Sequence, residues 1–439
     1  MERVSVDSSG NQANGDASAP FISADGRYVI FQSKASNLVA GDTNLKEDIF
    51  LYDRQTNQTT RVSVDSSGNE ANGDSWAPSI CAAGRYAAFA SDASNLVAND
   101  GNHMPDIFVR DCQTGVTTRV SVDSSGNEVN WPADPSDDPC ISADGRYVAF
   151  RSSGVNLVSG DTNSAIDVFV HDRQSGATTR VSVKSSGEQV FKNSYRPSMT
   201  THGRYVAFDS LASNLAPGQT TWNYDAFVHD RQTHETTRVS VDSAGNQGND
   251  MSLSASISAD GRFAAFESDA TNLVPGDTNG VRDIFVHDRS TGQTTRVSVS
   301  SSGNQADGRS FSPSIGGQDG RYVVFCSNAS NLVPGDTGRE DIFVHDRQTH
   351  QTIRLNVGSS GDEADNHSRA PCISADGNYV AFESAASNLV SGDTNALRDI
   401  FVTRRLSLIA TPVVRPLLPI TPPEPPAPVR PRRAPPIRR

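Results

Sequence analysis

Short apolar runs recur along the chain, and turns rich in Gly, Asp, Asn and Ser separate them. Residues 28–31 (Tyr-Val-Ile-Phe) are apolar at four successive positions, and so are residues 49–52 (Ile-Phe-Leu-Tyr). Runs this short, bounded by turn residues, favour strands over helices. A strand that is apolar on both faces must be covered on both faces. The pattern therefore predicts an all-β protein in which sheets pack against sheets.

One sequence element, Arg-Val-Ser-Val, returns at a nearly constant interval. Its copies begin at Arg3, Arg61, Arg119, Arg180, Arg238 and Arg296, and it returns as Arg-Leu-Asn-Val at Arg354. The interval is 58 residues, except for one of 61 residues that contains Trp131-Pro132-Ala133-Asp134-Pro135. A fixed period of this length indicates one architecture built from repeated supersecondary units. We expect a single repeat domain over residues 1–405 and a separate tail over 406–439.

Each unit contains four candidate strands, which the fifth unit illustrates. They are residues 256–258, 262–267, 283–287 and 294–299, and Asp260-Gly261 between the first two favours a type I′ hairpin turn. The fourth strand alternates apolar and polar residues, as expected for a half-exposed outer strand. Four-stranded antiparallel sheets packed between copies of themselves are the blades of a β-propeller. The sequence therefore predicts a seven-bladed β-propeller.

The ends of the repeat region predict how the ring closes. After residues 399–402, the third strand of the seventh unit, no fourth strand follows. Residues 2–6 (Glu-Arg-Val-Ser-Val) have the sequence of a fourth strand but precede the first unit. We expect this N-terminal strand to complete the last blade.

The repeats resemble a known family. Ser-Ala-Asp-Gly-Arg-Tyr-Val-Ala-Phe (142–150) and Asp-Ile-Phe-Val-His-Asp (283–288) are similar to the repeat of TolB-type, or WD40-like, β-propellers. The resemblance covers nearly all of the chain before the tail. It implies a scaffold rather than one activity, because the family includes periplasmic binding proteins and the non-catalytic propellers of some peptidases. It also implies a periplasmic or secreted protein, but Met1-Glu2-Arg3 leads directly into repeat sequence without a secretory signal, so the compartment stays open.

Charge and composition exclude several classes of partner. The net charge is −13, and the last 34 residues contribute six Arg and one Glu, which leaves the repeat region at −18. Such an acidic body is a poor partner for nucleic acids or anionic lipid surfaces. No apolar run is long enough to span a membrane. The tail holds eleven Pro, so we expect it to be extended and disordered. We also expect the protein to be a monomer.

The loops between the second and third strands carry the strongest polar motif, Asp-Thr-Asn-x-x-x-Asp. Oxygen side chains at alternate positions of a tight loop suit Ca²⁺, whereas Asp and Asn also form Asx turns. The Ca²⁺ hypothesis and the turn interpretation both stay open, and we expect no other cofactor. The candidate ligands are Asp42, Asn44, Asp48, Asp161, Asn163, Asp167, Asp277, Asn279, Asp283, Asp393, Asn395 and Asp399.

Catalytic motifs are missing from the sequence. There is no Gly-x-Ser-x-Gly, no phosphate-binding loop and no His-Glu-x-x-His. Four histidines share one column of the third strand (His171, His229, His287 and His345). Because each belongs to a different blade, we expect them to be too far apart to share a metal ion and to be packing residues.

One column of the repeats differs in every copy, just before the predicted first strand. The column holds Ser18, Trp76, Asp137, Tyr195, Leu253, Phe311 and Arg369. The loops around it should lie at one mouth of the central channel, on the same face as Trp131 and Trp222. Aromatic and charged side chains at a concave mouth suit stacking on sugar rings or gripping a peptide. The candidate ligand-binding residues are Trp76, Trp131, Asp137, Tyr195, Trp222, Phe311 and Arg369.

Two functional hypotheses follow. The favoured one is a non-enzymatic binding scaffold that uses one propeller face to bind a protein or a glycan. The alternative is an extracytoplasmic polysaccharide lyase or hydrolase with its site at the channel mouth. An enzyme would need acidic, basic or His residues clustered on one face, whereas the observed break in the repeat pattern is mainly aromatic.

Overall fold

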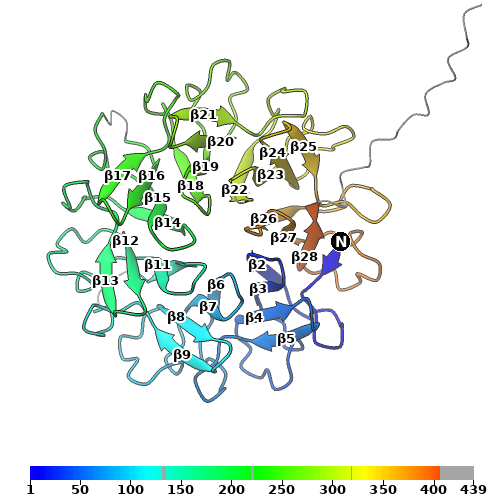
Figure 1. Cartoon of the computed structure of the whole chain (residues 1–439). Coiled ribbons are helices and arrows are strands. Elements are labelled where there is room, and N and C mark those ends of the chain that lie inside the picture. Colours follow the sequence, from blue (N-terminus) through cyan, green and yellow to red (C-terminus); the bar gives the residue numbers. More distant parts are fainter. Residues whose placement is uncertain (131–134, 219–221, 318, 406–439) are drawn as a thin grey trace, which may run out of the picture. The chain divides into compact units, whose positions relative to one another are not determined.

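The computed structural model describes residues 1–130, 135–218, 222–317 and 319–405, and these residues form seven four-stranded antiparallel sheets. Figure 1 shows the sheets arranged as blades in a ring, with consecutive blades adjacent. The predicted all-β, seven-bladed β-propeller is therefore confirmed. The proposed tail, residues 406–439, lies outside the described residues. No helix in the described part of the chain could cross a membrane.

Each blade runs from an inner strand at the ring axis to an outer strand at the rim. The inner strands are β2 (Ala17–Ile22), β6 (Ser75–Ile80), β10 (Asp137–Ile141), β14 (Ser194–Met199), β18 (Ser252–Ile257), β22 (Ser310–Gly316) and β26 (Ser368–Ile373). The second strands are β3 (Tyr28–Ser33), β7 (Tyr86–Ser91), β11 (Tyr147–Ser152), β15 (Tyr205–Ser210), β19 (Phe263–Ser268), β23 (Tyr322–Ser327) and β27 (Tyr379–Ser384). The third strands are β4 (Asp48–Asp53), β8 (Asp106–Asp111), β12 (Asp167–Asp172), β16 (Asp225–Asp230), β20 (Asp283–Asp288), β24 (Asp341–Asp346) and β28 (Asp399–Arg404). The outer strands are β5 (Gln58–Arg61), β9 (Val116–Arg119), β13 (Ala177–Arg180), β17 (Glu235–Arg238), β21 (Gln293–Arg296), β25 (Gln351–Arg354) and β1 (Glu2–Arg3).

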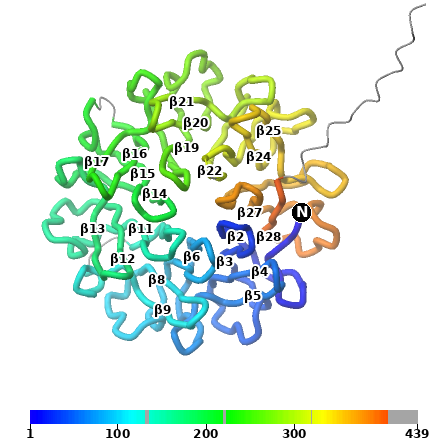
Figure 2. The backbone as a smooth tube through the Cα atoms, viewed as in Figure 1, coloured from blue at the N-terminus to red at the C-terminus, as the bar shows by residue number. Residues whose placement is uncertain are grey.

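The N-terminal strand closes the ring, as the sequence predicts. The last sheet has the order β1-β28-β27-β26, and Glu2 and Arg3 pair with Val402 and Phe401. The backbone amide of Val4 extends the pairing by donating to the carbonyl of Ile400 at 2.8 Å. Figure 2 shows this contact, where the blue N-terminal segment lies beside the red β28.

The hydrophobic core lies between blades rather than within them. One cluster joins Ile30 and Ile49 of the first blade to Ile80, Phe89 and Phe108 of the second, and all five are at most 3 % exposed. Within a blade, the rings of Phe89 and Phe108 stack with centroids 5.9 Å apart. Both faces of the second and third strands are therefore covered, as their apolar pattern requires.

Two kinds of local prediction are wrong in the fifth unit, namely the bounds of two strands and the type of the hairpin turn. The inner strand, β18, begins at Ser252 rather than at residue 256, and β21 ends at Arg296 rather than at residue 299. The Asp260-Gly261 turn is not of type I′, because of these two residues only Gly261 has a positive φ, at 77°. Its amide donates to the carbonyl of Ser258 at 2.8 Å, and the Asp260 carboxylate accepts from the backbone amide of Arg262. The side chain of Asp260 therefore stabilises a turn with a single left-handed glycine.

Candidate functional site

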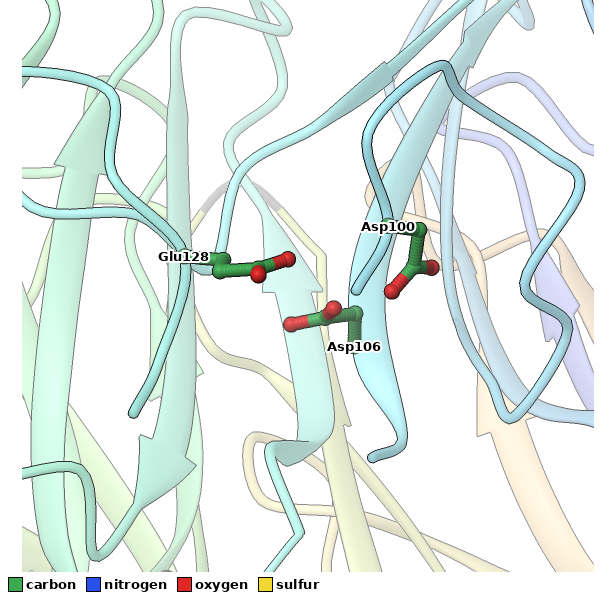
Figure 3. Close-up of side chains that lie close together, drawn as sticks. All are labelled: Asp100, Asp106 and Glu128. Atoms are coloured by element: carbon green, nitrogen blue, oxygen red, sulfur yellow. The ribbon is translucent and has the colours of Figure 1, made fainter. Parts of the chain in front are cut away.

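The Asp-Thr-Asn-x-x-x-Asp loops bring their carboxylates together around an arginine. In the second blade, Nη1 of Arg119 lies 3.3 Å from Asp100 Oδ1, 3.1 Å from Asp106 Oδ2 and 2.7 Å from Glu128 Oε2. Figure 3 shows the three carboxylates, whose oxygens lie within 4.8 Å of one another. Arg119 is the first residue of the second Arg-Val-Ser-Val copy after the N-terminal one, so two recurring motifs of the sequence meet at this point.

Corresponding arginines contact the predicted Ca²⁺ ligands in the other blades. Their Nη1 atoms lie 3.0–3.5 Å from the two Asp residues of the motif, in the sets Arg61 with Asp42 and Asp48, Arg180 with Asp161 and Asp167, Arg296 with Asp277 and Asp283, and Arg3 with Asp393 and Asp399. A second group of three carboxylates, Asp336, Asp341 and Glu363, surrounds Arg354 at 3.2–3.7 Å. A guanidinium thus supplies positive charge at each of these sites. The Ca²⁺ hypothesis stays a prediction, and an ion would have to compete with the arginine.

The Asn of the motif shapes the loop. Asn163 Nδ2 donates to Asp167 Oδ2 at 3.0 Å, and its Oδ1 accepts from the backbone amide of Ala165, which closes an Asx turn. Asn44, Asn279 and Asn395 make the same pair of contacts in their own blades. Ser182, from the Arg-Val-Ser-Val element, donates to Asp167 Oδ1 at 2.5 Å. Each loop is therefore fixed to the outer strand by bonds that need no metal.

Burial perturbs the acids at these sites. Desolvation, together with the neighbouring carboxylate of Asp48, raises the pKa of Asp42 to about 6. Asp100 has a pKa of about 6 for the same reason, with Asp106 as its neighbour. Burial also raises the pKa of Asp341 to about 7. These carboxylates are costly to ionise without the arginine, which makes the arginine a structural requirement.

The four histidines of the third-strand column are packed inside their blades. They are 3–7 % exposed, and Nδ1 of each lies 2.9 Å from a threonine hydroxyl of the outer strand, such as Thr178 for His171. Burial lowers the pKa of His229 and of His345 to about 4, so both are neutral at pH 7. None of the described carboxylate groups that could hold a metal includes these histidines.

The ring encloses a central cavity of about 600 Å³. Its wall is built from the inner strands, beginning at the third residue of most of them, and it is mainly small and apolar. Prolines form one layer (Pro20, Pro78, Pro139, Pro197, Pro313 and Pro371), and a layer of Ile22, Ile80, Ile141, Met199, Ile257, Ile315 and Ile373 forms another. Charged side chains enter the lining at two places, Asp138 and Arg196. The channel wall is therefore mainly apolar, and its charged side chains, Asp138 and Arg196, lie near the start of the inner strands.

The residues of the variable column lie within the inner strands, not before them: Asp137 is the first residue of β10, and the other six are the second residues of their strands. They do not line the cavity, whose wall begins one residue later. Trp76 and Phe311 instead pack on the hydrophobic clusters between adjacent blades, so packing does constrain this column. Arg369 is exposed, Trp222 is 74 % exposed, and Trp131 lies outside the described residues.

A backbone irregularity follows each of these residues. The residue that follows each member of the column has a positive φ of 49–55°, although none is glycine: Ala19, Ala77, Asp138, Arg196, Ser254, Ser312 and Ala370. The pairing with the second strand shifts register at the same point, as in a β-bulge. Bulges redirect side chains and are frequent next to binding sites. Here the bulge turns consecutive residues toward the blade interface and toward the channel.

The variable column continues into neighbouring strands, which the sequence comparison missed. The residues paired with it on the second strands are Gln32, Ala90, Arg151, Asp209, Glu267, Cys326 and Glu383. The residues immediately before the third strands are Glu47, Pro105, Ile166, Tyr224, Arg282, Glu340 and Arg398. Comparing every repeat position, instead of one, would have found both columns. The three columns together are called the variable mouth below.

Polar residues of the variable mouth join neighbouring blades. Glu383 accepts a hydrogen bond from the backbone amide of Ala19, and Glu267 accepts one from Ser312, at 3.0 and 2.8 Å. Asp209 is fully enclosed, accepts from the amide of Ser254 and pairs with Arg196 at 3.1 Å. Burial raises the pKa of Asp209 to about 6 despite that arginine. These acceptors hold the left-handed residue of the next blade in place.

Blades two to four carry the most connected part of the variable mouth. Trp76 Nε1 donates to Asp137 Oδ1 at 2.8 Å, and Arg151 forms ion pairs with Asp137 at 2.6 Å and with Asp138 at 2.8 Å. The guanidinium of Arg151 also lies 5.5 Å from the ring centroid of Tyr195. We call Trp76, Asp137, Asp138, Arg151 and Tyr195 the aromatic–ionic cluster. It unites three residues of the predicted binding column and fixes them by mutual contacts.

Comparison with known proteins supports the fold and assigns no function. No family model and no curated protein matches the sequence. Among solved structures, an oligogalacturonate lyase from Vibrio parahaemolyticus is 11 % identical, covers 88 % of this chain and 90 % of its own, and has a TM-score of 0.53. The β-propeller domain of the Trilobed protease from Pyrococcus furiosus is 11 % identical, with 88 % and 95 % coverage and a TM-score of 0.52. TolB from Acinetobacter baumannii is 15 % identical, with 82 % and 66 % coverage and a TM-score of 0.40.

The chain is a seven-bladed β-propeller, similar in fold to the oligogalacturonate lyase and to the propeller domain of the protease. The propeller fold that the repeat sequence implies is confirmed. At these identities the similarity concerns the fold alone. Function therefore has to be argued from the residues of this chain.

Proposed function

We propose that the protein is a non-enzymatic binding scaffold that holds an oligosaccharide at the variable mouth. The observation that carries the proposal is where the repeats differ. Loops, hairpin turns and blade interfaces reuse the same residues from blade to blade, whereas the three columns of the variable mouth differ almost throughout. Residues released from the common pattern beside a cavity are candidates for recognition.

The aromatic–ionic cluster has the chemistry that sugar binding needs. Trp76 and Tyr195 are half-buried and offer planar faces, and aromatic side chains of this kind bury much surface at little cost in side-chain entropy. Asp137, Asp138 and Arg151 offer hydrogen-bonding groups whose positions are fixed by their own ion pairs. A site whose side chains are already ordered binds with a smaller entropic cost.

The test is a glycan array probed with the full chain, followed by titration of the best ligand. The double variant Trp76→Ala, Tyr195→Ala should weaken binding at least tenfold, because both stacking surfaces are lost. Phe191→Ala is the matched control, since Phe191 is 68 % exposed but lies outside the cluster, and it should leave the affinity unchanged. Equal affinity of the double variant and the wild type would refute the proposal.

The same incubation separates the remaining alternatives. Release of shorter saccharides from a bound polymer would favour the lyase or hydrolase hypothesis. Binding of a protein but of no glycan, with the same loss in the double variant, would keep the site and change the ligand class.

A further inference from the structure

An arginine packs on an aromatic ring at six of the seven junctions between blades, and all seven junctions lie within the described residues. Each arginine directly follows a third strand, and its guanidinium carbon lies 3.7–4.6 Å from the ring centroid of a residue in the preceding blade. The pairs are Arg54 on Tyr379, Arg173 on Tyr86, Arg231 on Tyr147, Arg289 on Tyr205, Arg347 on Phe263 and Arg405 on Tyr322.

Each of these arginines also donates to a backbone carbonyl. The acceptor is the glycine of the hairpin turn in the arginine's own blade, as in Arg173 to Gly145 at 2.5 Å and Arg231 to Gly203 at 2.8 Å. The other four make the same bond at 2.5–2.7 Å. One ring face and one carbonyl oxygen therefore define a site for a guanidinium group.

The junction between the first and second blades has the same ring and the same carbonyl but no arginine. Gly84 lies against Tyr28 so closely that a Cβ on it would come within 2.2 Å of the ring, as Gly145 lies against Tyr86. The residue that follows β8 is Cys112. In the described part of the chain, no hydrogen-bond donor reaches the carbonyl of Gly84. Tyr28 keeps one cation, Arg27, at 4.7 Å.

Cys112 does not replace the chemistry of the arginine. Burial of its sulfur raises the pKa of the Cys112 thiol to about 12, so the group is neutral at pH 7 and a weak donor. The residue as a whole is exposed, which leaves the position accessible from solvent. Asp53 pairs with Arg27 at 2.6 Å beside Tyr28, as Asp111 pairs with Arg85 beside Tyr86 at the next junction.

We propose that this junction binds a guanidinium group from outside the chain, namely an arginine side chain of another polypeptide. The ring of Tyr28 takes the face of the guanidinium, as at the other six junctions, and the carbonyl of Gly84 accepts one N–H bond. The proposal is independent of the variable mouth and of any glycan ligand.

The first experiment lets the chain fill the site itself. Cys112→Arg should raise Tm by about 2 °C, because the new side chain can adopt the contacts seen six times in the same molecule. In the crystal structure of this variant the guanidinium should lie over Tyr28 and bond to Gly84. Cys112→Ser is the control and should leave Tm unchanged. A Cys112→Arg variant with an unchanged or lower Tm, or with its new side chain in solvent, would overturn the proposal.

The second experiment measures binding of a capped tripeptide, acetyl-Gly-Arg-Gly-amide, by ligand-detected NMR. The wild type should show saturable binding, and the citrulline analogue, which lacks the charge, should show none. Cys112→Arg should abolish the binding. Arg173→Cys should add a second site of the same kind, which separates the role of this geometry from general attraction to an acidic protein. Tripeptide binding that survives in Cys112→Arg contradicts the proposal.

Discussion

The two ends of the propeller channel follow opposite rules. At the end that carries the Asp-Gly turns, the same aromatic, glycine and arginine contacts recur at six junctions. At the variable mouth, the column residue near the start of the inner strand is different in all seven blades. Both ends belong to the same strands and share one core, so burial alone does not explain the difference. The repeated end uses one set of contacts at nearly every junction, whereas the variable mouth joins its blades through side chains that differ from blade to blade.

The repeated regions show how an acidic chain can be held together without metal ions. Seven arginines of the outer strands lie against loop carboxylates, and the arginines at the junctions lie on aromatic rings. The junction contacts recur at six of the seven junctions between the described blades, where they hold each blade against its neighbour. The variable mouth can change because the loops around it are already fixed by these contacts.

The largest loss of stability is expected on removal of β1, which completes the last blade from the opposite end of the sequence. Deleting residues 1–7 removes β1, Arg3 and the buried Val4 and Val6, which are 0 % and 7 % exposed. Burial of the two valines alone is worth about 3–6 kcal/mol, and the edge of β28 would be left open. We expect a large fall in the free energy of unfolding, measured by urea denaturation. An unchanged midpoint would show that closure contributes little.

The next effect compares an arginine of the repeated region with one of the variable mouth. Arg119→Leu leaves the buried Asp106 and the half-buried Asp100 and Glu128 without their counter-charge, and removing one partner of a buried ion pair costs about 3–5 kcal/mol. Arg369→Ala should change stability by less than about 0.5 kcal/mol, because Arg369 is exposed and pairs only at the surface.

A compensating variant makes this comparison sharper. Adding Asp100→Asn and Glu128→Gln to Arg119→Leu should recover part of the lost stability in thermal melts, since fewer buried charges then lack a partner. If the triple variant is no more stable than Arg119→Leu, repulsion between the carboxylates is not the cause.

A smaller loss of stability, confined to acid pH, is expected from His229 and His345, which belong to a column that holds histidine in only four blades. Burial and the nearby His234 lower the pKa of His229 to about 4, and burial with His350 does the same for His345. Their unfolded pKa is about 6.5, so the unfolded chain gains protons first as the pH falls. Stability should therefore be lost between pH 6.5 and 4, by up to about 3 kcal/mol for each histidine.

The variant His229→Thr, His345→Thr isolates this contribution. Thr403 occupies the same column in the seventh blade, so threonine is compatible with the position. Buried carboxylates such as Asp42 have a raised pKa and act in the opposite direction, and they are common to both proteins. The difference in unfolding free energy between the two proteins should be independent of pH above about pH 7.5 and change steadily toward pH 4. A constant difference would mean that the histidines do not titrate in this way.

The architecture could be predicted from the sequence because each of the seven repeats carries the same pattern of strands and turns. The spacing of Arg-Val-Ser-Val gave the number of blades, and the unpaired segment 2–6 gave the closure. The arginine–carboxylate contact was missed, since Arg119 lies 13 residues after Asp106, and Glu128 reaches them only through the return of the chain after β9. An Asp-rich loop considered alone suggests a metal ion, and nothing in the loop itself indicates that a guanidinium of the chain lies against the same carboxylates.

The candidate binding site was predictable in part. The comparison of repeats selected Trp76, Asp137 and Tyr195, and the structure brings these three together through Arg151. Their burial could not be read from sequence, because the left-handed bulge that separates blade-facing from channel-facing residues contains no glycine to reveal it. The position of these residues in the repeat indicated where they lie. The direction in which their side chains point depends on the backbone conformation at the bulge and could not be predicted.

Ring closure by β1 has a consequence for the order of synthesis. Among the strands of the ring, β1 is synthesised first, and it pairs with residues about 400 positions later, near Phe401 and Val402. At about 5–20 residues per second, translation needs on the order of 20–80 s to deliver that partner. Until then the nascent chain carries an unpaired strand at its beginning and a growing, open arc of blades behind it. The circle can close only after β28 has been made, so the open arc with the most blades exists just before β28 is synthesised.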